Sequence, residues 1–331
     1  MIVVTGATGH IGNVLIRQLK AEGKAVRVLV LPDDDLRPIS GLDVETVSGD
    51  VTDLTSLESA FKGADIVFHL AGIVTIMPGM AKLLERVNVG GMRNVTAACR
   101  TTGVRRLVYT SSVHAIAEPP LGTPIDESQP FDPDRVLGDY ARSKARATLL
   151  LLDEVAKGGL DAVICCPTGV IGPGDYGISN IGQLIMDFAS GQLKSYVSGA
   201  YDFVDVRDVN RGLILAAEKG QNGRHYIFSG DQVQVLELMK ELERDIGYPA
   251  PTYRIPSAIA RAAGVLASVY YRLLRRRPVF TAYSIDVLRS NSEVSSARAR
   301  HELGFTSRPW QESIRDQVEW FRAEAMLPER G

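Results

Sequence analysis

The sequence predicts an α/β fold, in which a doubly wound parallel sheet is joined to a smaller, mostly helical C-terminal unit. Three observations support this prediction. Short apolar segments alternate with amphipathic ones through the first half of the chain, which is typical of a parallel sheet covered by helices on both faces. A turn with three glycines follows the first apolar segment, at Thr5–Gly12. The alternation weakens after Pro167, and from about residue 231 the pattern is mostly helical.

Strands are expected where short runs are rich in apolar and β-branched residues, because strands buried on both faces have this composition. These runs are Ile2–Thr5, Val26–Leu31, Val44–Val47, Ile66–Leu70, Leu107–Ser111 and Ala162–Cys166. The amphipathic segments predict helices at His10–Glu22, Ser56–Phe61, Leu83–Thr101, Asp139–Ala156 and Asp208–Glu218. Gly23, Gly63, Gly103 and Gly158 each stand where a helix should end, as C-terminal glycines do. Tyr226–Phe228 predicts one more strand that returns to the sheet.

The chain is expected to form two domains, both discontinuous. Residues 1–168 and 200–230 would form the nucleotide-binding domain, and residues 169–199 and 231–331 the substrate-binding domain. Gly172–Gly177 has the composition of a loop at their boundary. Ligands of open parallel sheets bind at the carboxyl ends of the strands. A cleft between that edge and the second domain is therefore the expected site.

Composition narrows the class of protein. With 331 residues, 45% hydrophobic residues and a net charge of −2, the chain has the composition of a soluble globular enzyme and no electrostatic basis for a nucleic-acid partner. No apolar run reaches the roughly 18 residues that a membrane span needs. Cys99, Cys165 and Cys166 lack metal-ligand spacing, so no metal site is expected. Reduced thiols and a fold that starts near Met1, without room for a signal peptide, predict a cytoplasmic protein.

The glycine turn predicts a binding site for a dinucleotide. Gly6, Gly9 and Gly12 suit three separate needs: a tight turn, close approach of a pyrophosphate, and close packing of the next helix on the strand. The phosphates would then face the free N–H groups and the positive dipole end of that helix. Between a strand and a helix, the motif predicts a Rossmann-type domain.

A second motif predicts proton-transfer chemistry. Tyr140 and Lys144 are four residues apart, so they share one face of the predicted helix. A free phenol has a pKa near 10, and a nearby cation lowers that pKa toward the range useful for general acid–base catalysis. A solvated surface pair would have the same spacing. The functional interpretation gains support from Thr110–Ser112, where a hydroxyl at the end of a predicted strand could bond a substrate oxygen.

Together these residues resemble the extended short-chain dehydrogenase/reductase family, also described as NAD-dependent epimerases and dehydratases. The resemblance covers nearly the whole chain and lies nearest the dihydroflavonol 4-reductase and 3β-hydroxysteroid dehydrogenase branch. It is carried by Thr5–Gly12, Gly49–Val51, Leu70–Gly72, Asn88, Ser112, Tyr140, Lys144, Tyr201–Val209 and Ser296–Phe305.

The resemblance implies roles for individual residues. Tyr140 would exchange a proton with the substrate, Lys144 would hold the nicotinamide ribose and tune the phenol, and Ser112 would position the substrate oxygen. Ser111 competes with Ser112 for that role, and Asn88 would either take part in catalysis or bond the backbone beside the cleft. The cofactor, NAD(P)(H), would be bound by Gly6, Thr8, Gly9, His10, Ile11, Gly12, Asp33, Asp50, Val51, Leu70, Ala71, Gly72, Thr110, Tyr140, Lys144, Pro167 and Thr168.

The choice between NAD and NADP depends on the end of the second strand. NAD-binding relatives carry an acid there and NADP-binding relatives often an arginine one residue later, whereas this chain has Val30 and Leu31. The three acids Asp33–Asp35 follow and would repel a 2′-phosphate, which mildly favours NAD. Asp33 could reach the ribose hydroxyls, or the acids could form only a solvated turn. Arg37 could still accept NADP.

Departures from the family pattern favour a dehydrogenase or reductase that acts on an apolar secondary alcohol or ketone. Val113 and His114 replace the acidic pair of sugar-nucleotide dehydratases, and Tyr201 replaces the diphosphate-binding arginine of the epimerases. His114 could line the pocket or satisfy a local hydrogen bond. The alternatives are an epimerase with tightly held NAD, and a non-catalytic dinucleotide-binding sensor or scaffold.

Two surfaces suggest partners. Residues 257–277 combine apolar side chains at helical spacing with a basic end, which predicts either a core-facing helix or one that closes the pocket or touches a membrane surface. Relatives often form homodimers through the helices corresponding to Leu83–Thr101 and Asp139–Ala156. Trp310, Ile314, Val318 and Phe321 predict a terminal helix packed on the body of the protein.

Overall fold

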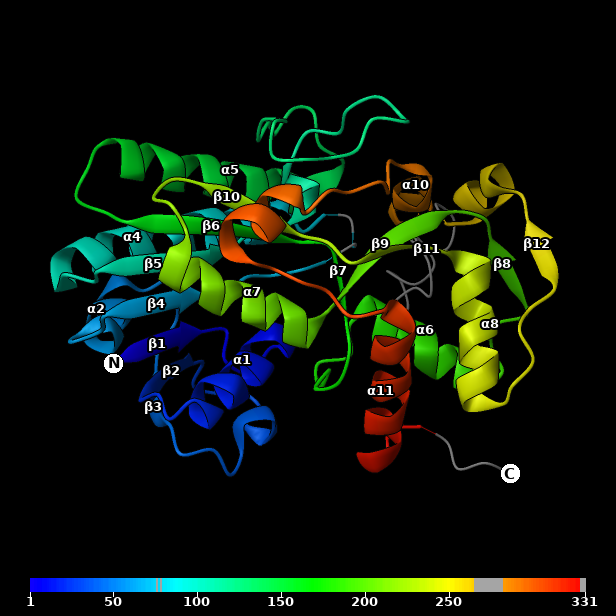
Figure 1. Cartoon of the computed structure of the whole chain (residues 1–331), viewed down its shortest axis with the longest axis horizontal. Helices are drawn as coiled ribbons and strands as arrows, with labels where there is room; N and C mark the ends of the chain where they lie inside the picture. The colour runs from blue at the N-terminus through cyan, green and yellow to red at the C-terminus, as the bar shows by residue number, and fades with distance from the viewer. Residues whose placement is uncertain (76, 78, 265–281, 328–331) are drawn as a thin grey trace.

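A seven-stranded parallel sheet forms the centre of the molecule (Figure 1). The computed structural model describes residues 1–75, 77, 79–264 and 282–327. The strand order is β10-β6-β5-β4-β1-β2-β3, with every neighbouring pair parallel. The strands are β1 (Ile2–Thr5), β2 (Val26–Val30), β3 (Glu45–Ser48), β4 (Ile66–His69), β5 (Arg106–Thr110), β6 (Ala162–Pro167) and β10 (His225–Phe228). The predicted Rossmann-type doubly wound sheet is therefore confirmed, since the strand order reverses between β1 and β4.

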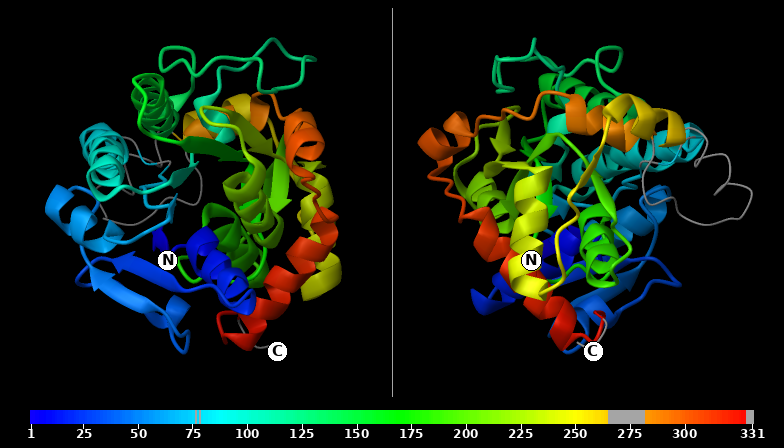
Figure 2. Two further views of the ribbon diagram at one scale, coloured as in Figure 1. Left: turned by 60° about the vertical axis from the view of Figure 1, so that its left-hand side comes forward. Right: turned by 90° about the vertical axis from the view of Figure 1, so that its right-hand side faces the viewer.

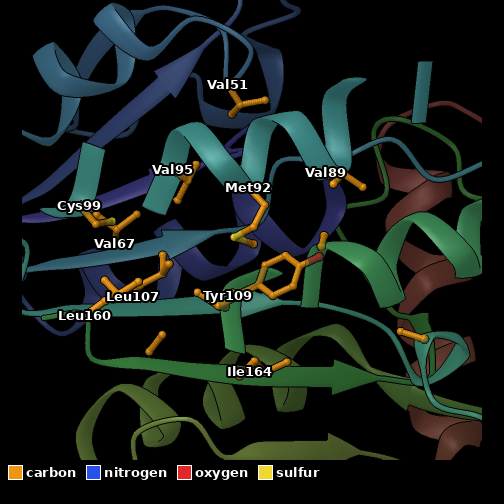
Figure 3. Close-up of a cluster of buried hydrophobic side chains, with 14 of the residues drawn as sticks. Val51, Val67, Val89, Met92, Val95, Cys99, Leu107, Tyr109, Leu160 and Ile164 are labelled. Atoms are coloured by element: carbon orange, nitrogen blue, oxygen red, sulfur yellow. The ribbon is translucent and has the colours of Figure 1, made fainter. Parts of the chain in front are cut away.

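Helices cover both faces of this sheet. One face packs against α1 (His10–Ala21) and α7 (Val206–Lys219), and the other against α2 (Leu54–Phe61), α4 (Gly91–Thr102) and α5 (Gly138–Ala156). Figure 3 shows the second layer, in which Met92 and Val95 of α4 lie over Val67 and Tyr109 of the sheet. These contacts account for the continuous apolar runs of the strands, because both faces are covered.

The helix expected over Leu83–Thr101 is divided into three parts. It begins as α3 (Ala81–Leu84), continues as a π-helical segment, η2 (Glu85–Gly90), and ends as α4. A π-helical segment has wider turns than an α-helix and is frequent at functional sites. It carries Asn88, so the departure from a regular helix falls at a residue of the predicted site.

The remaining elements form a second lobe beside the carboxyl end of the sheet (Figures 1 and 2). Strands β7 (Gly169–Ile171), β9 (Ala200–Asp205) and β11 (Asp231–Gln234) form one small sheet, and β8 (Ser195–Val197) pairs with β12 (Tyr253–Ile255). Its helices include α6 (Asn180–Ala189), α8 (Val235–Ile246), α10 (Ala282–Arg289) and α11 (Trp310–Ala323). Since β9 pairs within this lobe while α7 and β10 join the large sheet, the chain crosses between lobes near residue 205. The division into two domains stays a prediction.

The terminal helix packs as its pattern predicts, with Ile314, Val318 and Phe321 fully buried. Ion pairs fasten it and the segment before it to α7. Arg308 bonds Asp208 at 2.9 Å, and Arg207 bonds Asp316. The second lobe is thereby held against the large sheet.

Three sequence predictions concern membranes, redox state and the 257–277 segment. Across the described residues, no helix combines the length and apolar character needed to cross a membrane. Cys99, Cys165 and Cys166 are buried free thiols. Residues 265–281 lie outside the described part, so the predicted membrane contact through 257–277 falls largely on residues that the structure does not describe.

Candidate active site

The predicted site residues converge because parallel strands end at the same edge of a sheet. Gly6 follows β1, Leu70–Gly72 follow β4, and Ser111 and Ser112 follow β5. Asp50 and Val51 lie just after β3, Thr110 ends β5, and Pro167 ends β6. The helix α5, which carries Tyr140 and Lys144, contacts β6, and Lys144 bonds the backbone of Thr110 at the end of β5. The second lobe lies beside this edge.

The glycine turn forms a cradle in which backbone atoms touch. Gly6 has φ +72°, and a Cβ on it would lie 2.6 Å from the backbone nitrogen of Ala71. A Cβ on Gly12 would lie 2.1 Å from the Gly6 oxygen. Helix α1 begins within this turn, at His10, with Gly9 at the N-cap, no side-chain cap and no acidic residue in its first turn. Its open N–H groups and positive dipole end fit the pyrophosphate of a dinucleotide.

His10 and Thr8 have side-chain partners beyond the turn. His10 Nε2 donates to the carbonyl oxygens of Gly172 and Pro173, both at 3.1 Å, which ties the start of α1 to the loop after β7. Thr8 Oγ1 donates to Asp34 Oδ2 at 2.8 Å. The turn is therefore held from the second lobe on one side and from the acidic segment on the other.

The three carboxylates of the acidic segment, Asp33–Asp35, have different surroundings. Asp33 is exposed, Asp34 bonds the glycine turn through Thr8, and Asp35 forms a bidentate ion pair with Arg37. That ion pair lowers the pKa of Asp35 below its ordinary value. The structure thus brings Asp34 rather than Asp33 into contact with the glycine turn. The role of Asp33 toward a ribose stays a prediction.

Lys144 is a buried cation at the centre of the site. Its Nζ donates to the carbonyl oxygen of Thr110 at 2.8 Å and lies 5.0 Å from the centroid of the Tyr109 ring. Burial lowers the pKa of Lys144 from 10.5 to about 8. A Cβ on Gly72 would lie 3.4 Å from this Nζ and 3.1 Å from Asn88 Oδ1, so the backbone of Gly72 runs close beside the ammonium.

The phenol of Tyr140 lies near the hydroxyl of Ser112. Burial raises the pKa of Tyr140 to about 12, and the nearby Ser112 hydroxyl opposes this rise. Ser112 Oγ also accepts the backbone N–H of His114 at 3.2 Å. Ser111 Oγ bonds Thr148 Oγ1 at 2.8 Å, so of the two competing serines the structure brings Ser112 to Tyr140. A lowering of the Tyr140 pKa by Lys144 stays a prediction.

Asn88 bonds the backbone beside the cleft. Its Oδ1 accepts the N–H of Ile73 at 2.8 Å, and its Nδ2 donates to the Ile73 oxygen and to Ser143 Oγ. Asp50 and Thr168 are also held by backbone groups, of Thr52 and of Phe228. These residues shape the edge of the site and fix its loops.

Two buried residues beneath the site, His69 and Tyr109, were not among the predicted site residues. His69 accepts or donates a hydrogen bond with Thr5 Oγ1 at 2.8 Å, and its ring stacks on Tyr109 at 5.6 Å. Burial, with a smaller contribution from the Lys144 charge, lowers the pKa of His69 to about 3. Thr5, His69 and Tyr109 are register partners on β1, β4 and β5, a relation that becomes visible only when the strand order is known.

A small cavity of about 20 Å³ lies between the segment that follows Ser112 and the second lobe. Polar and apolar side chains share its lining: Val113, His114, Glu118, Ile125, Thr168, Tyr201, Asp202, Ser290, Asn291, Ser292 and Val294. Within it, His114 Nε2 is hydrogen-bonded to the hydroxyl of Tyr201. Tyr283 of α10 packs against Gly138, where a Cβ would lie 2.5 Å from its ring. An apolar substrate stays a prediction.

Comparison with known proteins identifies the class to which this fold and site belong. The model of the NAD dependent epimerase/dehydratase family matches residues 2–228. The chain belongs to this family, whose members include oxidoreductases.

Curated relatives match the chain over nearly its whole length. Sterol demethylase protein B of Methylococcus capsulatus is 36% identical over 98% of this chain and 99% of its own. A putative dihydroflavonol 4-reductase of Synechocystis is 30% identical over 96% of this chain and 94% of its own. The 3beta-hydroxysteroid-dehydrogenase/decarboxylase isoform 1 of Arabidopsis thaliana is 29% identical over 96% of this chain and 79% of its own. The predicted branch of the family is confirmed, and the protein is an oxidoreductase.

Proposed function

We propose that the protein transfers hydride between a nicotinamide cofactor and an apolar ring alcohol or ketone, with Tyr140 as general acid and base. One observation carries this proposal: the Tyr140 phenol near Ser112 and the buried Lys144 stand at the same sheet edge as the glycine cradle. A substrate oxygen bonded to both hydroxyls would then lie beside the cofactor site.

The residues divide the work of the reaction. Ser112 Oγ accepts the N–H of His114, so its own proton is free to bond a substrate or phenol oxygen as negative charge develops there. Tyr140 gives a proton to the new alkoxide in reduction and takes one from the alcohol in oxidation. Lys144, with a pKa of about 8, is mainly charged at neutral pH and favours the phenolate. The bound nicotinamide supplies or accepts the hydride.

The names of the relatives and the chemistry of the cavity support a ring substrate without phosphate. Sterols or hydroxysteroids appear in the names of two relatives and a dihydroflavonol in that of the third. Tyr201 stands where the resemblance places an arginine that binds diphosphate, and burial raises the pKa of this phenol, so it is neutral. A neutral phenol lacks the charge and fork geometry that bind a diphosphate.

NAD is the proposed cofactor. The Asp34 carboxylate is held at the glycine turn by Thr8, where it would repel an additional phosphate on the adenosine ribose. Arg37, which could have bound that phosphate, is paired with Asp35. The charge balance of this segment therefore favours a free 2′-hydroxyl.

A kinetic screen tests the proposed function. Purified protein would be assayed with fused-ring ketones and alcohols, with NADH and NADPH or their oxidised forms in separate series. Tyr140→Phe should bind NADH as the wild type does, measured by fluorescence titration, and lose about 10²–10⁴-fold in turnover. Tyr196→Phe, on β8 outside the site, is the matched control and should keep full turnover.

Other outcomes distinguish the alternatives. Undiminished turnover in Tyr140→Phe would remove the acid–base assignment. Conversion of a sugar nucleotide without net consumption of cofactor would favour an epimerase. Tight NADH binding with no turnover of any compound in the screen would favour a sensor or scaffold.

A further inference from the structure

A row of contacts runs beneath the site from the glycine turn to Lys144. Thr5 Oγ1 accepts the N–H of Ala71 at 3.3 Å and shares a hydrogen bond with His69 Nδ1 at 2.8 Å. The His69 ring stacks on that of Tyr109, with centroids 5.6 Å apart and planes inclined by 22°. The Lys144 ammonium lies over the same Tyr109 ring, 5.0 Å from its centroid. The row thus joins the segment beside the glycine turn to the buried cation.

The Lys144 ammonium has few groups that offset its charge. Lys20 and Lys157 each pair with a carboxylate, whereas in the described part of the chain no carboxylate pairs with Lys144. Its hydrogen bond to a neutral carbonyl oxygen, that of Thr110, uses one of its three protons. The side chain that η2 brings beside it, Asn88, is an uncharged amide. Because a buried cation without a counter-ion is costly, another group has to stabilise the charged form.

The ionisable groups that face Lys144 do not supply a negative charge. On β6, Cys166 is close enough to act on the ammonium, but burial raises the pKa of this thiol, so it is neutral. Burial likewise raises the pKa of Tyr140, one turn earlier on α5, to about 12. On β4, burial lowers the pKa of His69 to about 3, and the charge of Lys144 adds to this effect. Among these groups, the π-electron face of Tyr109 is the partner whose polarity suits a cation.

The Tyr109 ring is held rigidly under the ammonium. The residue is 1% exposed and packs in the layer between the sheet and α4, which carries Met92 (Figure 3). His69 and Tyr109 are register partners on β4 and β5, so their side chains lie on the same face of the sheet. His69 is held in turn by Thr5, its register partner on β1. Three neighbouring strands therefore fix the ring that faces Lys144.

We propose that the face of the Tyr109 ring takes the place of a counter-ion for the Lys144 ammonium, and that His69 is a positioning residue that holds this ring. The consequence for catalysis rests on the proposed function, in which a charged Lys144 favours the phenolate of Tyr140. Without the ring, the ammonium would keep only the Thr110 carbonyl and would lose its proton at lower pH. The row beneath the site would thereby determine the pH range in which the enzyme works.

Direct titration of Lys144 tests the proposal without an assay of activity. The protein would be prepared with carbon-13-labelled lysine, and the Cε signal of Lys144, identified by its absence in Lys144→Met, would be followed by NMR as a function of pH. In Tyr109→Leu the pKa of Lys144 should fall by about one, a ten-fold change in its protonation equilibrium, as loss of a buried cation–π contact predicts. Tyr109→Phe keeps the ring and should keep the pKa of the wild type.

A second ring deletion controls for the cavity that Tyr109→Leu leaves. Phe68→Leu removes an equally buried ring from the opposite face of the sheet, so it should destabilise the protein without moving the pKa of Lys144. Tyr109→Met, which fills more of the space, replaces Tyr109→Leu if that variant does not fold. Circular dichroism would show which variants are folded.

Variants of His69 test its positioning role in the same titration. His69→Leu removes the stacking partner of Tyr109 and should lower the pKa of Lys144 by part of the amount seen in Tyr109→Leu. His69→Phe keeps a ring that can stack and should restore the wild-type pKa. A group that acted only through the hydrogen bond to Thr5 would not be replaced by Phe.

The pH profile of ketone reduction tests the consequence for catalysis. If turnover with NADH requires a charged Lys144, Tyr109→Leu should lose about five-fold in kcat/KM relative to the wild type at about pH 8, where its lower pKa leaves little of the charged form. At about pH 6, where both proteins are charged at this position, the loss should be small. A purely structural role of the ring would lower kcat/KM equally at both pH values.

The outcomes separate the two proposals. A pKa of Lys144 that is unchanged in Tyr109→Leu, or that rises because water enters the cavity, would overturn the role of the ring and leave the proposed function standing. An unchanged pKa in His69→Leu would overturn the positioning role of His69. A lowered pKa with an unshifted pH profile would confirm the contact and contradict the role of the Lys144 charge in turnover. If the wild type reduces no ketone, the proposed function fails for this substrate class, and the titration alone decides the role of Tyr109.

Discussion

The two sides of the cleft are built by different means. On the cofactor side, the tightest contacts are made by backbone atoms, as where Gly12 meets Gly6 and Gly6 meets Ala71. On the substrate side they are made by side chains from distant segments. His114 bonds Tyr201, and Tyr283 of α10 packs on Gly138 at the start of α5. The first kind of contact constrains which residue types fit, and the second constrains which segments meet.

This difference explains why function can vary within one fold. A backbone cradle tolerates almost no change, since any added atom meets a fixed neighbour. A pair of side chains can be exchanged for another pair without moving the sheet, so new substrates can be accepted while the cofactor site is kept. Substitutions on the two sides should therefore affect different measured quantities.

The largest effect is expected at Gly12 on the cofactor side, in contrast to Gly169 on the substrate side. In Gly12→Ala the new Cβ would lie 2.1 Å from a backbone oxygen, so the turn must open. We expect loss of NADH binding and a stability decrease of about 3 kcal/mol, the upper end for an overpacked site, measured by fluorescence titration and urea unfolding. Gly169→Ala displaces the Tyr201 ring instead, because a Cβ there would lie 2.4 Å from Tyr201 Cε1, so it should impair ketone kinetics while NADH affinity is kept.

Gly177→Ala is the control for both, because a Cβ there would meet open space within 4 Å. It should change neither stability nor NADH affinity. If Gly12→Ala bound NADH normally, or Gly169→Ala lost NADH affinity as well, the proposed separation of the two sides would be wrong.

Lys144 lies between the two sides. Its burial predicts a pH-dependent decrease in the stability of the folded state. Its pKa is lowered from 10.5 to about 8, so the folded state binds fewer protons than the unfolded state between these values. Stability from this group should be lowest below pH 8 and rise toward pH 10.5. The full shift corresponds to about 3 kcal/mol.

The measurement compares the free energy of unfolding of wild type and Lys144→Met at pH 7 and pH 10. Between these pH values the wild type should gain most of that stability relative to the variant, which has no titrating group at this position. A difference that stays constant with pH would show that the ammonium is solvated rather than buried. The loss of the bond to Thr110 affects both pH values alike and does not change the comparison.

The difference between the cofactor side and the substrate side also determines which features the sequence could predict. The strands of the large sheet, α1 and the glycine turn follow from periodicity and local steric rules, and the structure confirms them, whereas the short strands of the second lobe were not predicted. Ser111 and Ser112 could not be distinguished, because a register error of one residue exchanges the faces of a strand. The His69 contacts with Thr5 and Tyr109 depend on strand order. The His114–Tyr201 bond depends on how the two lobes meet.

The π-helical segment at Asn88 was not predicted either. Its sequence, Glu85–Gly90, is compatible with an ordinary α-helix, and the departure arises where Asn88 reaches Ser143 of α5 and the backbone at Ile73. A tertiary contact therefore overrides local propensity at this point. On the cofactor side, local rules therefore predict the secondary structure except where a side chain bonds another element.

The smallest expected effect concerns the acidic segment, the one part of the cofactor side that depends on charge rather than on backbone contact. Asp34→Asn keeps an oxygen that can accept the Thr8 hydroxyl and removes the negative charge. One charge a few ångströms from a phosphate in water is worth about 1 kcal/mol. The affinity for NADPH relative to NADH should therefore rise about five-fold, and the rise should shrink at high salt because the site is screened. Asp33→Asn serves as the comparison. If it changes the ratio more than Asp34→Asn does, the exposed Asp33 reaches the ribose as the sequence suggested, and the contact through Thr8 only orders the turn.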